Sequence, residues 1–531
     1  MDRSQLVKAA RPAFPEADRT GRFGCSAASK PTWVDNRRKY RFQVQEQVSE
    51  TADLGRSAAR NAAHTLGGQA AKFTLQLASV VVLARLLSEE DFGLVGMVLA
   101  IIGIGHIIKD FGLASAAIQA RDLTRSQRDN LFWLNAGAGL VMAGLAAACA
   151  PLVMSFYGRE DVGVIVLWLA PSLLLAGMTT QYRADLARRL RLGRAAIAEL
   201  SSTALGFAAG VVTAFMGWGP GALIAQQLVG GVAGFILFGL FAGWIPGLYR
   251  WREPMRPLFG VGIPLFVTQI VTYIASNADS VIIGRFFGPV PVGLYNRGLQ
   301  LVRVPMTQVR GPLDTLSLSV LSKVTDSPER FLSFVRRGHI VMIYPLLALA
   351  GGLIAAAPVV IDLALGPRWA GAAVYVQLIA LGEAMNSLAS AGGWIYASKG
   401  LGLALLRFTL FSAFVRLLFL TAGASFGPIG VAAGFAVAQC VLWPVSLWWI
   451  GRVSRLPTGV MIRAALRSIL VCAVPAVGTW CVVSVTAGWS SVVTVPLAIV
   501  VHLMGFALMA FLPWVRQDYR TLYETARMVR R

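Results

Sequence analysis

The sequence predicts an all-α polytopic membrane protein, with about 14 transmembrane helices in two parallel six-helix lobes plus two C-terminal helices. The composition is the first observation behind this fold class. The 531 residues are 56% hydrophobic and only 14% charged, with a mean hydropathy of +0.63. A soluble protein of this size carries roughly 25% charged residues. The other two observations are recurring apolar runs from residue 63 to residue 513 and a repeat at a spacing of 200 residues.

Each apolar run is long enough, at about 20 residues, to cross the hydrocarbon core as a helix. The predicted helices cover residues 63–86, 92–113, 131–156, 161–182, 194–216, 219–246, 257–283, 292–322, 335–357, 369–396, 402–423, 428–450, 460–484 and 490–513. The expected organisation is a disordered basic cytoplasmic tail (1–60), an N-lobe (61–250), a C-lobe (251–455), helices 13 and 14 (456–515) and a basic cytoplasmic tail (516–531).

Lys and Arg lie mainly in alternate loops, those that follow the even-numbered helices. The intervening loops are short and poor in cations, such as SEED (88–91) and GWGP (217–220). By the positive-inside rule both termini are expected in the cytoplasm. The net charge of +22 is therefore interpreted as a topogenic signal, and we expect no nucleic-acid partner.

Residues 1–60 differ from the rest because they are polar, basic and rich in Pro, Gly and Ser. They have no continuous apolar region, so they do not form a cleavable secretory signal. We interpret them as a disordered cytoplasmic tail that contacts anionic lipid. A translation start further downstream is the alternative.

The five cysteines and four histidines show no CxxC or metal-ligand spacing. Most of the cysteines lie in apolar segments, which disfavours a disulfide framework. We therefore expect neither a metal site nor a cofactor.

The repeat consists of VVLARLLSEEDFGLVG (81–96) and VIIGRFFGPVPVGLYN (281–296). In each copy an apolar run reaches an arginine, Arg85 or Arg285, passes a short turn and resumes at Gly-Leu. Six helices separate the copies, so the first and seventh helices run in the same direction and the halves form parallel repeats. Each arginine is expected to anchor a helix end at the extracytoplasmic interface. A gate between the lobes is the alternative.

The first and seventh helices carry matching polar stripes, spaced i, i+3, i+7, i+10 along one helix face. The stripes are Gln69, Lys72, Gln76 and Ser79 in the first copy, and Gln269, Thr272, Ser276 and Asp279 in the second. Polar groups in hydrocarbon need a partner or a water-filled cavity, and we expect the stripes to line a cavity between the lobes. Hydrogen bonding between helices within one lobe is the alternative.

The eighth helix has a longer polar face, and its members step by four and three residues. They are Asn296, Gln300, Arg303, Thr307, Arg310 and Asp314. The Arg310–Asp314 pair at i, i+4 is a structural explanation for two of them. It leaves Arg303 and Lys72 without a counter-charge, which favours a cavity with surplus positive charge. Such a cavity suits an anion, and the guanidinium fork suits phosphate.

These patterns give the candidate site. The predicted substrate-binding residues are Lys72, Arg303, Arg310, Gln69, Gln76, Gln269, Thr272, Gln300 and Asp314. Asp279 and Glu383 are predicted as ion-coupling carboxylates or as counter-ions, and Glu383 is at least as well suited to pair with Arg303. No catalytic residue is predicted.

Other polar and proline residues carry weaker expectations. Arg407 and Arg416 lie towards the ends of the eleventh helix and are expected to extend to the interface. Pro264, Pro305 and Pro345 are expected to interrupt the seventh, eighth and ninth helices and kink them.

Three segments carry a resemblance to a known family. They are LARLLSEEDFGLVGM (83–97), DFGLASAAIQARDLTRSQRDNLFWLN (110–135) and ADSVIIGRFFGPVPVGLYNRGLQLVRVPMTQVRGPL (278–313). The chain resembles, over residues 55–515, the Wzx-type polysaccharide flippases of the MATE/MurJ/Wzx (MOP) transporter superfamily, in the colanic-acid and exopolysaccharide exporter branch.

The resemblance implies a V-shaped, two-lobed bundle in the bacterial inner membrane. It would move an undecaprenyl-pyrophosphate-linked oligosaccharide repeat unit to the periplasmic leaflet by alternating access, for exopolysaccharide, O-antigen or capsule synthesis. Cavity cations of such families contact the pyrophosphate or the sugar, and Lys72, Arg303 and Arg310 stand where such residues are expected. Membrane lipids, a polysaccharide polymerase and a co-polymerase are the other implied partners, and a monomer is expected.

Two other functions are open to a membrane protein of this kind. A cation-coupled multidrug antiporter of the same superfamily needs a cavity dominated by carboxylates, whereas the predicted one is cationic. A membrane polymerase or ligase acting on lipid-linked sugars needs catalytic residues on substantial periplasmic loops, and the predicted loops are a few residues long. We therefore expect a transporter and no enzyme.

Overall fold

The computed structural model describes residues 67–108, 117, 123–251, 263–321 and 327–530, which are helical apart from short connections and contain no strand. The predicted tail at residues 1–60 lies outside the described residues. The helices of residues 63–531 belong to one compact unit. The division of this unit into lobes at residue 250 stays a prediction.

Among the described residues, the first half holds the helical residues 67–86 and seven further helices with defined bounds. These are α3 (Glu89–Ile108), α5 (Arg125–Ala148), α6 (Ala150–Tyr157), α7 (Glu160–Leu169), α8 (Pro171–Arg188), α9 (Leu192–Phe215) and α10 (Gly221–Ala242). The predicted third and fourth helices are each divided into two, at Pro151 and Pro171. Proline has no N–H group and is tolerated in the first turn of a helix, so each proline lies where a new helix begins.

The second half begins with α12 (Ile263–Phe287), which corresponds to the helix of residues 67–86. It is followed by α13 (Pro289–Leu321), α14 (Pro328–Ala364), the 3-10 turn Pro367–Trp369, α15 (Ala372–Leu388), α16 (Ala391–Ser398), α17 (Gly402–Ala424) and α18 (Gly427–Ser454). Pro305 and Pro345 lie inside α13 and α14. Pro264 is the second described residue of α12, and residues 252–262 before it lie outside the described residues, so the expected interruption at Pro264 stays a prediction.

Three helices close the chain: α19 (Gly459–Val485), α20 (Ser491–Met509) and α21 (Pro513–Arg530). All three pack against α14. The segment predicted as a C-terminal tail is therefore largely the helix α21. Its Asp518 is buried, forms an ion pair with Arg467 of α19 and accepts a hydrogen bond from the hydroxyl of Tyr344, with 2.7 Å between the oxygens.

Twelve helices among the described residues are long and apolar enough to cross a membrane. Two further predicted spans, residues 67–86 and α13, are helical but are not among these twelve. Helix α13 carries the long polar face, which lowers its apolar character. A multi-pass membrane protein is thus confirmed, whereas the count of about 14 spans stays a prediction.

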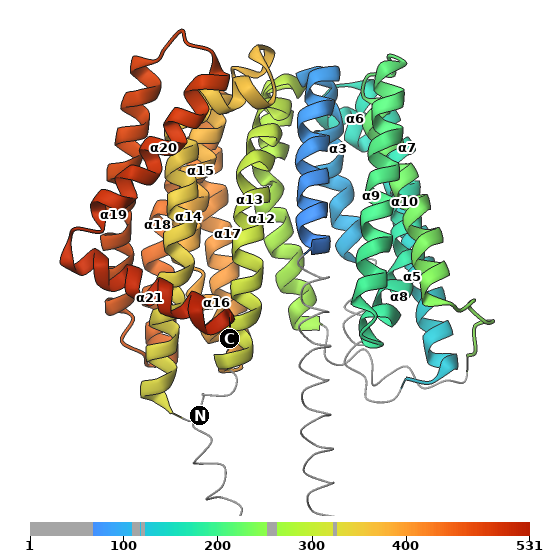
Figure 1. Cartoon of the computed structure of the whole chain (residues 1–531). Coiled ribbons are helices and arrows are strands. Elements are labelled where there is room, and N and C mark those ends of the chain that lie inside the picture. Colours follow the sequence, from blue (N-terminus) through green and yellow to red (C-terminus); the bar gives the residue numbers. More distant parts are fainter. Residues whose placement is uncertain (1–66, 109–116, 118–122, 252–262, 322–326, 531) are drawn as a thin grey trace, which may run out of the picture. The chain divides into compact units, whose positions relative to one another are not determined.

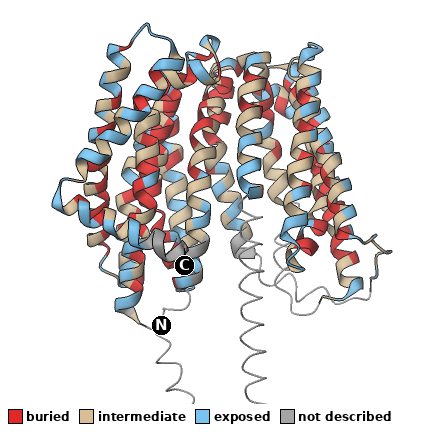
Figure 2. Cartoon of the chain, viewed as in Figure 1, coloured by how far each residue is buried: buried red, intermediate tan, exposed pale blue. Residues whose placement is uncertain are grey.

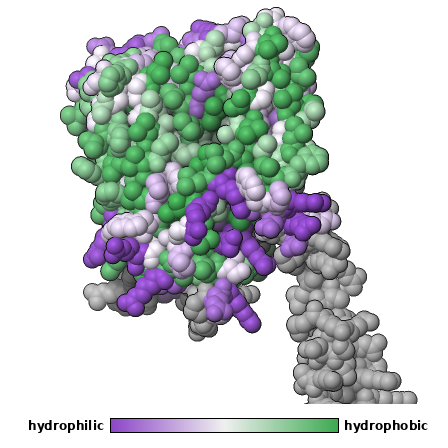
Figure 3. All heavy atoms as spheres, turned by 90° about the vertical axis from the view of Figure 1, so that its left-hand side faces the viewer, coloured by the Kyte–Doolittle hydropathy of each residue, from purple (hydrophilic) through white to green (hydrophobic). Residues whose placement is uncertain are grey.

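The helices form two groups that meet at α3, which packs against both α12 and α13 (Figure 1). Within the first group α9 packs on α10 and α5 on α8, and within the second α17 packs on α18 and α14 on α15. Buried residues gather on the faces turned towards other helices (Figure 2). On the face formed by the last helices, hydrophobic side chains form a broad band (Figure 3). This is the surface expected of a protein surrounded by lipid.

The two ends of the bundle differ in charge. The connections α8–α9, α16–α17 and α18–α19, at the lower end in Figure 1, carry cations. Their basic residues are Arg189, Arg191, Lys399 and Arg455. The connection between residues 67–86 and α3, at the upper end, is followed by three acidic residues in the first turn of α3. The described connections therefore follow the alternation on which the predicted orientation depends.

Candidate functional site: a cationic cavity below an interhelical seal

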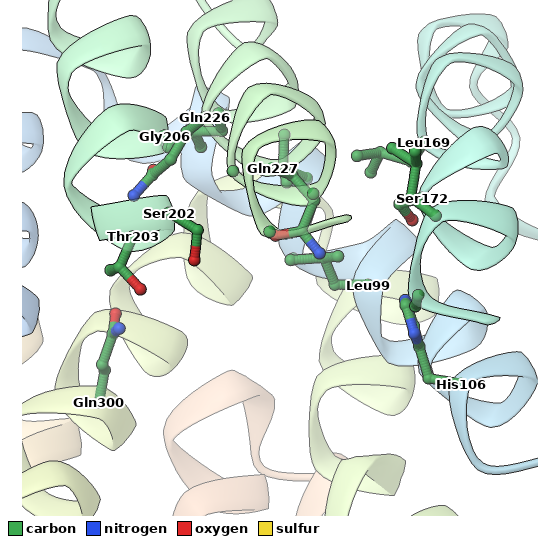
Figure 4. Close-up of a pocket in the computed structure, with 18 of the residues that line it drawn as sticks. Leu99, His106, Leu169, Ser172, Ser202, Thr203, Gly206, Gln226, Gln227 and Gln300 are labelled. Atoms are coloured by element: carbon green, nitrogen blue, oxygen red, sulfur yellow. The ribbon is translucent and has the colours of Figure 1, made fainter. Parts of the chain in front are cut away.

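A cavity of about 1170 Å³ lies between the two helix groups. Its walls come from α3, α7, α8, α9 and α10 on one side and from α12 and α13 on the other. Figure 4 shows polar side chains of α9, α10 and α13 projecting into it. The polar face of α13 therefore turns towards the other helix group.

The charged side chains of the cavity wall are Arg183, Arg297 and Arg303. None of the residues that form the wall in the described part of the chain is acidic. Arg183 and Arg297 form no ion pair with a described residue, and each guanidinium lies over a phenyl ring instead. The Arg297 guanidinium carbon lies 3.7 Å from the ring centre of Phe92. The cavity thus carries positive charge that its own wall leaves unbalanced.

Arg303 lies between this cavity and a smaller one of about 220 Å³ within the second helix group. Its Nε donates a hydrogen bond to Glu383 of α15, with 2.6 Å between the atoms. The expectation that Arg303 lacks a counter-charge is therefore wrong. Glu383 occupies the counter-ion position, one of the two roles predicted for it, because a guanidinium held among helices needs a nearby carboxylate.

The Arg310–Asp314 pair is present, with 3.3 Å between Nε and the carboxylate. Asp314 also accepts a hydrogen bond from the indole nitrogen of Trp394, at 2.8 Å. Arg310 borders only the smaller cavity. Both residues are thus held by contacts within the second helix group.

The polar stripe of residues 67–86 faces its own helix group. Lys72 forms an ion pair with Glu199 of α9, so the expectation that it lacks a counter-charge is also wrong. Ser79 accepts a hydrogen bond from the Gln226 side chain of α10, at 2.9 Å. Gln69 is exposed and Gln76 half-buried, and neither forms part of the cavity wall.

The stripe of α12 is divided in the same way. Gln269 and Thr272 are exposed and border neither cavity, and the Thr272 hydroxyl donates to the Thr268 carbonyl. Ser276 borders the smaller cavity. Asp279 is completely buried and borders neither cavity.

Asp279 is held by two partners. It forms an ion pair with Arg416 of α17 at 2.9 Å and accepts a hydrogen bond from the Tyr295 hydroxyl at 2.6 Å. The prediction that Arg416 extends to the interface is wrong, since this residue is only 8% exposed. A buried carboxylate requires a counter-charge, and this keeps the guanidinium inside the bundle.

Several cavity residues were not predicted from the sequence: Arg183, Thr203, Gln227 and Arg297. Arg297 follows Asn296 of the predicted stripe, so a wider polar face on that helix would have included it. The adjacent carboxamides Gln226 and Gln227 in an otherwise apolar segment were a second available signal.

Above the cavity the two helix groups touch at the repeat. We name this contact the upper seal; it is formed by Ala84, Arg85, Gly93, Gly293, Leu363 and Trp369. A Cβ on Gly93 would collide with the carbonyl oxygen of Pro289. Equivalently, a Cβ on Gly293 in the second copy would collide with the carbonyl oxygen of Glu89. The repeated glycines therefore allow α3 and α13 to cross in backbone contact.

Two hydrogen bonds join the helix groups beside this crossing. Arg85 donates to the Leu363 carbonyl at 2.8 Å, and the Trp369 indole donates to the Ala84 carbonyl at 2.8 Å. Phe92 packs edge-on against Trp369, with ring centres 5.6 Å apart. Arg85 thus links the two groups, as the gate alternative requires. Arg285 is exposed, and its guanidinium carbon lies 5.7 Å from the ring centre of Phe156 on α6, which is also a contact between the groups.

A membrane-spanning helical bundle with a cationic cavity between two helix groups defines a membrane transport protein. The family model described as "Polysaccharide biosynthesis protein" matches residues 82–374, more than half of the chain. The chain belongs to this family.

Individual relatives agree with this assignment. The chain is 26% identical over 373 residues to the lipopolysaccharide biosynthesis protein WzxC of Escherichia coli (strain K12), covering 69% of this chain and 75% of the relative. It is 26% identical over 301 residues to the teichuronic acid biosynthesis protein TuaB of Bacillus subtilis (strain 168), covering 56% and 62%.

Among solved structures, the lipid II flippase MurJ in an inward closed conformation shares the fold, with a TM-score of 0.65 at 13% identity. This match covers 85% of the present chain and 99% of that structure. The resemblance to Wzx-type polysaccharide biosynthesis proteins is therefore confirmed, and the MurJ structure shows that the fold is shared.

Proposed function

We propose that this protein moves an undecaprenyl-pyrophosphate-linked oligosaccharide from the cytoplasmic to the periplasmic leaflet by alternating access. One observation carries the proposal: the cavity is polar and positively charged, and its described wall contains no acidic residue. A pyrophosphate in a membrane interior needs cationic donors, and guanidinium groups provide them with bidentate geometry. Arg297, Arg303 and Gln300 are the proposed substrate contacts.

The orientation follows from the charges at the two ends. We assign the basic lower end to the cytoplasm by the positive-inside rule, with both termini on that side and the protein in the bacterial inner membrane. The upper seal then closes the periplasmic end. We propose that this arrangement is the state that receives substrate from the cytoplasmic leaflet.

The relatives support a glycan substrate, since their names place them in lipopolysaccharide and teichuronic acid biosynthesis. We propose that the protein transports without catalysing a reaction and acts as a monomer beside a polymerase and a co-polymerase. The multidrug antiporter is the weaker candidate. Asp279 and Glu383, which would have to serve it as cation-binding carboxylates, are each paired with an arginine.

A reconstituted vesicle assay tests the proposal. Lipid-linked oligosaccharide placed in one leaflet should become accessible to a membrane-impermeant glycosidase on the other side only when the protein is present. The Arg303→Ala protein should lose this activity while still inserting into the membrane. Arg407→Ala is the matched control, because Arg407 is exposed on α17 and borders neither cavity. Protein-independent flipping, or full activity of Arg303→Ala, contradicts the mechanism.

A further inference from the structure

We propose that α9 and α10 form a glycan-binding wall in the cavity, centred on Thr203 and Gln227 and faced by Gln300 of α13. This inference rests on the proposed function and assigns the two parts of the substrate to different walls. The uncharged wall binds sugar hydroxyls, and the arginines of α13 bind the diphosphate. Figure 4 shows Gln300 extending towards Thr203, and Gln227 extending from α10 into the open space.

The hydroxyl groups of this wall already donate hydrogen bonds to backbone carbonyls of their own helices. Thr203 donates to the carbonyl of Glu199 at 2.7 Å, and Ser202 donates to the same carbonyl at 3.0 Å. On α8, Thr179 donates to the Leu175 carbonyl at 2.7 Å. All three residues border the cavity. Their oxygen lone pairs are therefore available as acceptors and their protons are not.

The side-chain carboxamides of Gln227 and Gln300, unlike these hydroxyls, still have their donor hydrogens available. The side chains of Gln227 and Gln300 form no hydrogen bond with any described residue, although both border the cavity. Each supplies two donor hydrogens and an acceptor oxygen. The neighbouring Gln226 differs, because its amide nitrogen is committed to Ser79. Gln227 and Gln300 thus keep all their side-chain hydrogen-bonding groups available to a ligand.

This combination fits a neutral polyhydroxylated ligand. A sugar hydroxyl donates one proton and accepts others, so it can donate to the Thr203 oxygen and exchange hydrogen bonds with a carboxamide. A phosphate only accepts, and the lone pairs of committed hydroxyls repel it. The diphosphate is better placed at Arg297 and Arg303, which belong to the opposite wall. The substrate therefore lies across the cavity, with the glycan on the first helix group.

Binding measurements on the purified full-length protein test the assignment with two ligands. One is the lipid-linked oligosaccharide extracted from a strain that lacks the protein, and the other is undecaprenyl diphosphate without sugar. The double variant Thr203→Val, Gln227→Leu should weaken binding of the glycan-bearing lipid by about tenfold, as expected for two lost hydrogen bonds. Binding of undecaprenyl diphosphate should stay within about twofold of the wild type.

Thr213→Val is the matched control. Thr213 lies on the same helix and donates to the Ala209 carbonyl at 2.7 Å, but it does not border the cavity. This variant should bind both lipids as the wild type does. Equal weakening for both lipids, or no weakening for either, overturns the glycan wall while leaving the flippase proposal intact. A wild-type protein that binds neither lipid overturns the proposed function itself.

Discussion

The two copies of the repeat, residues 67–108 and α12–α13, share a backbone arrangement but differ in polar chemistry. Gly93 and Gly293 occupy equivalent places in one crossing. At the equivalent positions 79 and 279 the copies diverge. Ser79 forms a neutral hydrogen bond with Gln226, whereas Asp279 forms a buried ion pair with Arg416.

The difference shows which features the duplicated scaffold requires. The crossing needs a residue without a side chain in both copies, because both backbones approach equally closely. The polar residues at positions 79 and 279, by contrast, each find a partner within their own helix group. The two copies also differ in space at the equivalent positions 103 and 303. A Cβ on Gly103 would collide with the Tyr273 hydroxyl, whereas the side chain of Arg303 borders a cavity.

The largest expected effect is that of Asp279→Asn. The substitution removes one partner of a fully buried ion pair and leaves the Arg416 charge unbalanced. We expect the free energy of unfolding in detergent to fall by about 3–5 kcal/mol. The double variant with Arg416→Met should recover part of this loss, because the stranded charge is gone. An unchanged stability with lost transport would instead assign Asp279 to ion coupling.

The next effect concerns the crossing itself. Gly93→Ala and Gly293→Ala should each destabilise the protein by about 1–3 kcal/mol, because the added Cβ meets a backbone carbonyl that cannot rotate away. Thermal unfolding in detergent measures this loss. Gly144→Ala on α5 is the control, since no atom lies within 4 Å of the added Cβ. The two variants should lose similar amounts of stability. If their losses differ from each other by more than either differs from that of the Gly144→Ala control, the crossing is not symmetric.

Two ion pairs, Arg303–Glu383 and Lys72–Glu199, should rank in strength by their burial. The side chains of Arg303 and Glu383 are 31% and 13% exposed, and those of Lys72 and Glu199 are 36% and 32% exposed. Double-mutant cycles with uncharged partners should give a coupling on the order of 1–2 kcal/mol for the first pair. The second pair should give about 0.2–1 kcal/mol, because water screens it more strongly. The reverse order would contradict the ranking.

The membrane-spanning helical fold could be predicted from local patterns in the sequence. Apolar runs predicted the helices, and the repeat predicted that residues 67–86 and α12 correspond. The divided helices at Pro151 and Pro171 were missed because a run of apolar residues does not show where a chain changes direction.

The ion pairs were less accessible to sequence reasoning. Arg310 and Asp314 are one helical turn apart, so their pairing could be predicted from spacing. Lys72 and Glu199 are 127 residues apart, and Asp279 and Arg416 are 137 apart. Such pairs depend on which helices pack together, and a single sequence does not contain that information. For the same reason the surplus positive charge was predicted at Lys72 and Arg303. The cavity arginines that form no ion pair with a described residue are Arg183 and Arg297.

The smallest expected effect is that of Ser79→Ala, the counterpart of Asp279→Asn in the first copy. The substitution removes the 2.9 Å hydrogen bond from Gln226. Because Gln226 borders the cavity, water can replace the lost partner, and no charge is stranded. We expect a loss of about 0.5–1 kcal/mol in the free energy of unfolding. Ser155→Ala is the control, since this exposed serine bonds only to its own helix, at Leu152. A loss as large as that of Asp279→Asn would mean that the two copies depend equally on this position, and that their difference in charge has no energetic consequence.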